Sequence, residues 1–97
     1  MVHVLARITF RPEAAAAGHD LLAELVAATC LESGCLGYEV LQRNDAPHVF
    51  QTVERWADQA AADAHMAAAH VGKAIAAATP LLAAPPEIVS FTRVLEA

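Results

Sequence analysis

The spacing of the hydrophobic residues changes along this chain, and the order of those changes limits the fold more than any other feature. Residues 2–10 alternate between apolar and mixed side chains, which is typical of a strand with one buried face. The apolar residues of 13–32 recur every three or four positions, as on an amphipathic helix. Alternation returns in 35–43, where Leu36, Tyr38 and Val40 share one face, and 57–70 is rich in alanine. We predict strands at 2–10, 35–43, 48–55 and 87–95, and helices at 13–32 and 57–70.

This strand–helix–strand–strand–helix–strand order is typical of an α+β, ferredoxin-like βαββαβ subunit with both helices on one face of the sheet. A chain of 97 residues forms one such domain, residues 1–97. The other sheet face still carries Leu, Val and Phe side chains. Because 24 of the residues are alanine, the chain has little large apolar surface to bury by itself. A second copy is the simplest cover for the open face, so we expect a homodimer.

Glycine and alanine positions set the predicted helix ends. Gly34 suits a left-handed cap after the first helix. The second helix is predicted from alanine content alone, with Gly72 ending or kinking it and residues 73–78 adding a further turn. On such a helix His65 and His70, at spacing i, i+5, point about 140° away from each other. We therefore expect no metal site from this pair.

Charge and hydropathy exclude several classes of function. The net charge of −5 and the isoelectric point near 5.4 argue against binding to nucleic acid or to an anionic membrane surface. The apolar runs are too short to span a bilayer, and residues 1–7 show no signal-peptide pattern. Cys30 and Cys35 fit no zinc-ligand spacing. We expect a cytoplasmic protein with free thiols.

Five residues are candidates for a functional site. His65 lies at the boundary of the predicted apolar arc, where its ring could enter a pocket and move a proton. His70 lies in the polar arc. Trp56 and Tyr38 are the only residues of their kind and could form an aromatic wall and a hydroxyl donor. Arg43, on a strand, could hold an anionic substrate oxygen.

Each candidate also has a purely structural interpretation. The histidines could be surface residues, Trp56 a plug over the end of the core, and Tyr38 a core residue with a bonded hydroxyl. The strand arginines could be solvated, or could pair across the hairpin with Glu39 and Glu54. The arginines concerned are Arg7, Arg43 and Arg93.

Two blocks of the sequence resemble the antibiotic biosynthesis monooxygenase (ABM) domain family, which includes the YgiN-type quinol monooxygenases. Residues 32–40, Glu-Ser-Gly-Cys-Leu-Gly-Tyr-Glu-Val, resemble the family's E-x-G-C-x-x-Y-x-V stretch. Glu54-Arg-Trp56, followed by Ala60, Ala64-His65 and His70, resembles its E-x-W…A…H-x-x-x-x-H block. The predicted order of strands and helices is also that of the family.

The resemblance implies a dimeric α+β barrel that oxidises a hydroxylated aromatic, quinol or polyketide-like substrate with O₂ as a cofactor-independent monooxygenase. Deprotonation of an acidic phenol in a dry cavity gives an anion that can itself reduce O₂. Such a site needs a base, an aromatic-lined cavity and donors for an oxyanion. By this resemblance His65 is the proton acceptor and Trp56 a cavity wall, and Tyr38 and His70 contact the substrate.

Haem is not expected as a cofactor. The haem-degrading members of the family carry an Asn on the first strand and a Trp inside the second helix, and this chain has neither. Fold does not fix function, so two alternatives stay open. One is an isomerase of a small metabolite on the same scaffold, and the other is a non-catalytic ligand-binding or stress-response barrel.

Overall fold

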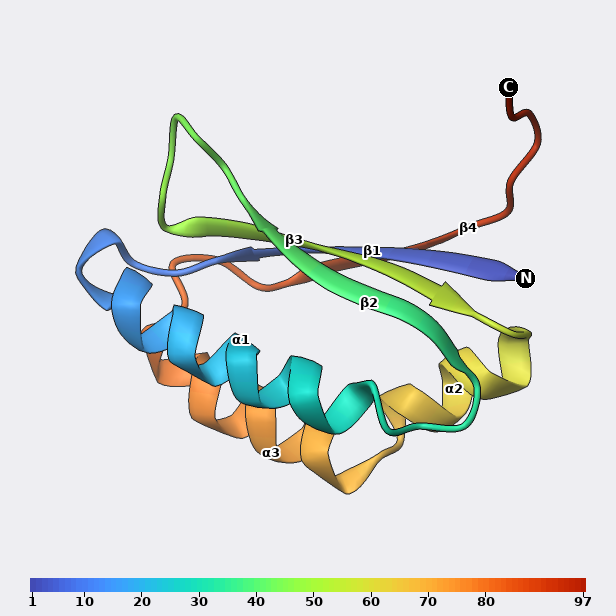
Figure 1. The fold of residues 1–97 in the computed structure, drawn as a ribbon. Coiled ribbons are helices and arrows are strands. Elements are labelled where there is room, and N and C mark those ends of the chain that lie inside the picture. The colour runs from blue at the N-terminus through green and yellow to red at the C-terminus, as the bar shows by residue number, and fades with distance from the viewer.

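The computed structural model describes residues 1–97 as one four-stranded sheet with helices packed on one of its faces (Figure 1). The elements follow the predicted order, with a divided second helix and two short 3-10 helices. They are β1 Val2–Thr9, η1 Pro12–Ala14, α1 Ala15–Thr29, β2 Cys35–Gln42, β3 Val49–Trp56, α2 Gln59–Met66, α3 Ala69–Ala78, η2 Thr79–Leu81 and β4 Glu87–Phe91.

The sheet order is β2-β3-β1-β4, and every pair of neighbouring strands is antiparallel. This is the ferredoxin-like arrangement, so the predicted fold class is confirmed. The alternation in β1 explains which face is covered. Val4 and Ala6 are buried toward the helices, and Phe10 continues their face just beyond the strand.

Two small hydrophobic clusters join the helices to the sheet. At one end, the Phe10 and Phe50 rings meet edge to face, with their centroids 5.7 Å apart. This cluster is completed by Ala14 of η1 and Leu22 of α1. At the other end, Trp56 packs against Val4 and Ala62. The space between the two clusters is where the candidate site lies.

The second helical region is divided at Ala68, whereas the prediction placed the end or kink at Gly72. Asp58 caps α2, since its carboxylate accepts a hydrogen bond from the Ala61 amide at 2.8 Å. Ala68 is extended, with φ −68° and ψ 144°, and α3 starts after it. Gly72 lies inside α3, so the prediction that it ends or kinks the helix is wrong. On one straight helix His65 and Val71 would point about 120° apart. The break allows both to be buried.

Two strands also differ from the prediction. β4 ends at Phe91, four residues before the predicted end. A register shift between Cys35 and Gly37 leaves Leu36 exposed, although simple alternation places it on the face of Tyr38. The shift allows both Cys35 and Tyr38 to pack against the cluster around Trp56.

Gly34 is required for a close approach of two chain segments. No glycine in the structure has a positive φ, so the predicted left-handed cap at Gly34 is wrong. A Cβ built on Gly34 would instead collide with the Cβ of Ala61 on α2. The Gly34 carbonyl also accepts a hydrogen bond from the Ala57 amide at 2.9 Å. Gly34 therefore lets the loop after α1 lie directly against α2.

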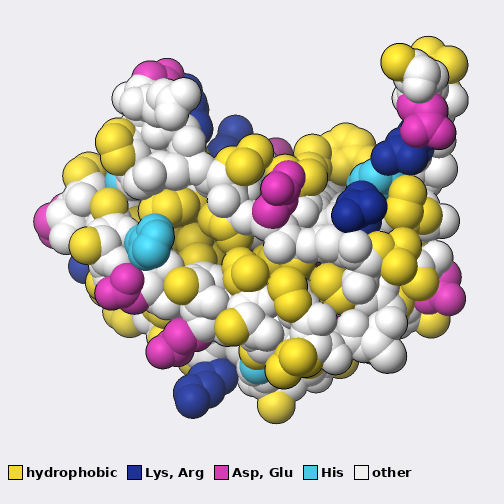
Figure 2. Space-filling model, viewed as in Figure 1, with side chains coloured by type: hydrophobic (Ala, Val, Ile, Leu, Met, Phe, Trp, Pro, Cys, Tyr) yellow, Lys and Arg dark blue, Asp and Glu magenta, His cyan; other side chains and the backbone are white.

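The sheet face away from the helices is open (Figure 1). Leu5 of β1 lies on this open face, because Val4 and Ala6 on either side of it face the helices. Its pairing partners Val53 and Val89 share its face. Phe91 on β4 is 46% exposed. Figure 2 shows hydrophobic side chains gathered between the sheet and the helices on the side facing the viewer. No helix has the length and apolar character needed to cross a membrane.

Replacing Gly34 with alanine should destabilise the protein by roughly 1–3 kcal/mol, as expected for overpacking against an atom that cannot swing aside. Chemical denaturation measures this loss. Gly72→Ala is the matched control, because a Cβ there meets nothing within 4 Å. The control should be neutral or stabilising by up to about 1 kcal/mol, since alanine favours the helix. Equal stability of Gly34→Ala and wild type would contradict this account of the loop.

Candidate active site

A cavity of about 280 Å³ lies between the sheet and α1 and α3, and most of its wall is hydrophobic. Fourteen of its nineteen lining residues are hydrophobic, so most of the wall offers water no hydrogen-bond partner. The polar groups come mainly from β2, β3 and α2. They are Tyr38, Thr52, Glu54 and His65. The cavity therefore suits a small ring compound with a polar group at one end.

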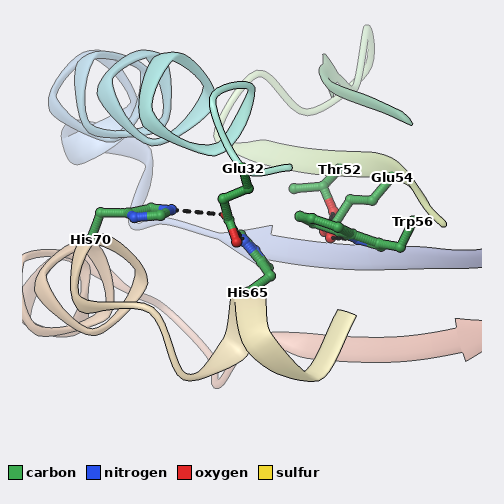
Figure 3. Close-up of polar contacts among 6 residues, drawn as sticks. All are labelled: Glu32, Thr52, Glu54, Trp56, His65 and His70. Atoms are coloured by element: carbon green, nitrogen blue, oxygen red, sulfur yellow. Dashed lines mark hydrogen bonds and ion pairs between the residues drawn. The ribbon is translucent and has the colours of Figure 1, made fainter. Parts of the chain in front are cut away.

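His65 is fixed at the cavity wall by a carboxylate behind it. The Nδ1 atom of His65 lies 2.7 Å from Oε2 of Glu32, and the histidine is only 4% exposed (Figure 3). Because a carboxylate accepts, Nδ1 carries the hydrogen and donates it. The other ring nitrogen, Nε2, is then left with its lone pair. Buried histidines held in this way can accept a proton from a bound molecule.

The same Glu32 oxygen also accepts a hydrogen bond from His70. The Nε2 atom of His70 lies 3.0 Å from Oε2 of Glu32, and the two imidazole rings are 6.1 Å apart (Figure 3). The expectation that the two histidines point away from each other is therefore wrong. It assumed one continuous helix, and the break at Ala68 turns α3 so that both rings meet Glu32.

A second buried carboxylate, Glu54, lies on β3 next to the cavity. Its Oε2 accepts a hydrogen bond from the Thr52 hydroxyl at 2.6 Å, and its Oε1 accepts one from Trp56 Nε1 at 3.0 Å. The Thr52 oxygen in turn accepts the Ala6 amide at 3.0 Å. Both oxygens of Glu54 therefore accept hydrogen bonds from side-chain donors. Glu54 thus brings negative charge to the polar end of the cavity.

Tyr38 is the neutral donor of the site. Its ring centroid lies 5.6 Å from that of His65, and its side chain lines the cavity. Burial raises the pKa of Tyr38 well above its ordinary value, and the negative charge of Glu54 raises it further. The phenol therefore keeps its hydrogen and can donate it to an oxygen atom of a ligand.

Trp56 lies behind the cavity rather than in its wall. It is 1% exposed, and its ring is 4.6 Å from the His65 ring with 32° between the planes. This tilted ring contact, together with the hydrogen bond to Glu32, leaves the His65 ring little freedom. Trp56 is thus placed to hold His65 and Glu54 in position.

Of the five predicted residues, Tyr38 and His65 line the cavity and Trp56 packs behind His65. His65, Trp56 and Tyr38 form one aromatic group. His70 is not among the lining residues and lies on the far side of Glu32. Arg43 is at the exposed hairpin tip, where its guanidinium binds both oxygens of Asp45 at 2.9 Å.

The predicted pairing of Glu54 with a strand arginine does not occur. Each strand arginine binds another partner: Arg7 binds Glu87, Arg43 binds Asp45 and Arg93 binds Glu96. The side chain of Glu54 lies on the helix side of the sheet, because its pairing partner on β1, Val4, faces the helices. Strand alternation from Trp56 could have shown this, since residues 52, 54 and 56 share one face. The strand and helix periods could not have placed Glu32, because its position depends on an irregular loop, and the only signal was its place in the block 32–40.

Comparisons with known proteins identify the family. The family model described as antibiotic biosynthesis monooxygenase matches residues 1–77. A comparison with curated proteins gives no match. Among solved structures, one described as an antibiotic biosynthesis monooxygenase is 29% identical with a TM-score of 0.93, over 98% of this chain and 100% of that one.

Two further solved structures are similar along nearly all of their length. A Mycobacterium tuberculosis protein is 29% identical with a TM-score of 0.91, over 99% of this chain and 97% of its own. A Pseudomonas aeruginosa protein is 31% identical with a TM-score of 0.89, over 97% and 94%. With the family model covering most of the sequence, the chain belongs to the antibiotic biosynthesis monooxygenase family.

Proposed function

We propose that this protein is a cofactor-independent monooxygenase of small hydroxylated aromatic compounds, of the quinol or polyketide-like kind. The observation that carries the proposal is the buried His65, whose Nδ1 is held by Glu32 while its ring lines a nearly apolar cavity. The family membership and the names of similar structures support the reaction class.

The residues divide the work as follows. His65 Nε2 accepts the proton of a phenol, and the resulting anion transfers an electron to O₂. Tyr38 donates a hydrogen bond to the substrate oxygen and stabilises the charge that develops there. Glu32 and Trp56 are positioning residues, because they act on the His65 ring. The apolar remainder of the cavity excludes water from the anion.

For a ring methylene next to such a phenol, the reaction balances without a further reductant. The substrate R₂CH₂ and one O₂ give R₂C=O and one H₂O. One oxygen atom forms the new carbonyl, and the other leaves as water with the two hydrogens of the methylene. The substrate supplies all the electrons, so the chain itself is not oxidised.

His65→Asn should reduce O₂ uptake about 100-fold or more with a reactive hydroxyanthrone or quinol, because it removes the general base. Asparagine can still donate to Glu32 from a position close to that of Nδ1, so folding should be preserved. The measurement is initial O₂ uptake, corrected for spontaneous oxidation, with a panel of both compound types.

The control for this test is His19→Asn, which changes an exposed histidine bonded to Asp20 at 3.2 Å. The control should keep the wild-type rate. Equal uptake in His65→Asn and wild type would remove His65 from the mechanism. Turnover that continues without O₂ would favour the isomerase alternative, and ligand binding without any turnover would favour the binding-protein alternative.

The raised pKa of Tyr38 gives a second prediction, which is simple to read because the chain has one tyrosine. In the folded protein, the tyrosinate absorbance near 295 nm should develop at a higher pH than in the protein unfolded by guanidinium, where tyrosine ionises near pH 10. The folded state binds this proton more tightly. Its contribution to stability is therefore present below the unfolded pKa and is lost as pH rises toward the folded pKa. Coincident folded and unfolded titrations would contradict a buried neutral phenol.

The open sheet face supports a homodimer as part of this proposal. Val89 on that face is 40% exposed although it is apolar. Light scattering should give twice the chain mass of 10.2 kDa. Val89→Arg should shift the mass toward the monomer, whereas Leu31→Arg, in the loop after α1 at 87% exposure, should not. A monomeric wild-type protein at micromolar concentration would contradict the dimer.

A further inference from the structure

Glu32, His65 and His70 come from three separate elements and place three metal-binding atoms together. Glu32 is in the loop after α1, His65 near the end of α2, and His70 at the start of α3. One carboxylate oxygen and two imidazole nitrogens all lie within 4.8 Å of one another. Figure 3 shows the carboxylate of Glu32 between the two rings. Of these three residues only His65 lines the cavity, so the cluster is distinct from it.

The donor set matches the preferences of one class of cation. Two imidazole nitrogens and one carboxylate oxygen suit Zn²⁺ and the neighbouring ions Co²⁺ and Ni²⁺, at bond lengths of about 2.0–2.2 Å. Ligand atoms around one tetrahedral ion stand about 3.3 Å apart at those bond lengths. The Glu32 oxygen is already 2.7 Å from His65 Nδ1 and 3.0 Å from His70 Nε2. Small side-chain movements are therefore enough to admit an ion.

We infer that Glu32, His65 and His70 form a binding site for a divalent cation of the Zn²⁺ class, and that the bound cation removes His65 from proton transfer in the cavity. The second half of this inference rests on the proposed function, and the first half does not.

The site is reached from outside the cavity. The side chains of His70 and Glu32 are 30% and 19% exposed, whereas that of His65 is 5% exposed. Glu32 lines a separate surface hollow together with Ser33, Gly34 and Asp58. A cation can therefore enter and leave while the cavity is occupied. A substrate in the cavity would not contact it, which indicates regulation rather than catalysis by the ion.

The effect on His65 follows from where its hydrogen must sit. Without a cation, Nδ1 carries the hydrogen that binds Glu32, and Nε2 has the free lone pair. A cation needs the Nδ1 lone pair, so the hydrogen of the neutral ring moves to Nε2. The nitrogen left for the cavity then donates and no longer accepts. The cation thus changes the function of the ring while moving it little.

Zinc titration of the metal-stripped, full-length protein tests the site without any substrate. Calorimetry should show one Zn²⁺ per chain in wild type and at least tenfold weaker binding in His70→Asn, which lacks one ligand. His19→Asn is the matched control, since His19 also lies beside a carboxylate but has no third ligand. Cys30→Ser controls for binding by the exposed thiol. Both controls should bind zinc like wild type.

Co²⁺ identifies the ligands. Binding should give visible d–d bands without a thiolate-to-cobalt charge-transfer band. It should also quench the fluorescence of the single tryptophan, because Trp56 lies 4.6 Å from the His65 ring. Equal zinc affinity in wild type and His70→Asn, a thiolate band, or no binding in wild type would each overturn the site.

The proposed change in His65 has its own readout, which separates it from the oxidation chemistry. In ¹⁵N-histidine spectra, zinc should move the hydrogen of His65 from Nδ1 to Nε2. Zinc should also inhibit O₂ uptake in wild type more than in His70→Asn, each measured against its own zinc-free rate. An unchanged tautomer in the zinc complex would overturn the second half of the inference. A protein that binds zinc with the tautomer change but consumes no O₂ would contradict the proposed function and leave the site intact.

Discussion

One oxygen atom, Oε2 of Glu32, holds together the part of the helix layer on which the candidate site depends. It accepts hydrogen bonds from two histidines on different helices, at 2.7 and 3.0 Å. The loop that carries it can reach α2 only because residue 34 has no side chain. These hydrogen bonds link three segments at one atom: helix α2, helix α3 and the loop that follows α1. Hydrogen bonds donated to a carboxylate are stronger than those between neutral groups, so the bond to Glu32 sets the orientation of His65.

A second carboxylate plays the corresponding part on the sheet side. Glu54 is 4% exposed, and burial of a charge is unfavourable unless the charge is hydrogen-bonded. One oxygen of Glu54 accepts a hydrogen bond from the Thr52 hydroxyl and the other accepts one from the Trp56 indole, so both oxygens have a donor. Because these buried polar groups find all their hydrogen-bond partners in this one arrangement, the network favours a single conformation of the side chains. His65 therefore packs against a tryptophan that is itself held in place, and the polar groups stay at one end of the cavity.

The features that follow regular periods could be predicted from the sequence. The alternation of β1 gave the covered face, and the segment order gave the ferredoxin-like subunit. The predictions that were wrong concern positions where those periods are interrupted. Alanine favours a helix at every position and marks no break, so the extended Ala68 had no local signal. The partnership of His65 with His70 was excluded for that reason. Glu32 was part of a resembling block, but its contact with two helices is set by tertiary packing.

The asymmetry of the cavity limits what this member of a broad family can accept. Fold alone permits many reactions, so the residues of the site decide which compounds are accepted. Apolar side chains of Ile8, Leu22 and Leu82 line one part of the cavity, and Tyr38 and Glu54 line another. A compound with hydroxyls on all sides would leave some of them without partners against the apolar wall, at a cost of about 1–3 kcal/mol each. A ring system with its hydroxyls on one edge avoids that cost. Under the proposed function, placing that edge beside Tyr38 would also bring a phenol hydrogen toward His65, so the same few residues would set both the binding orientation and the proton transfer.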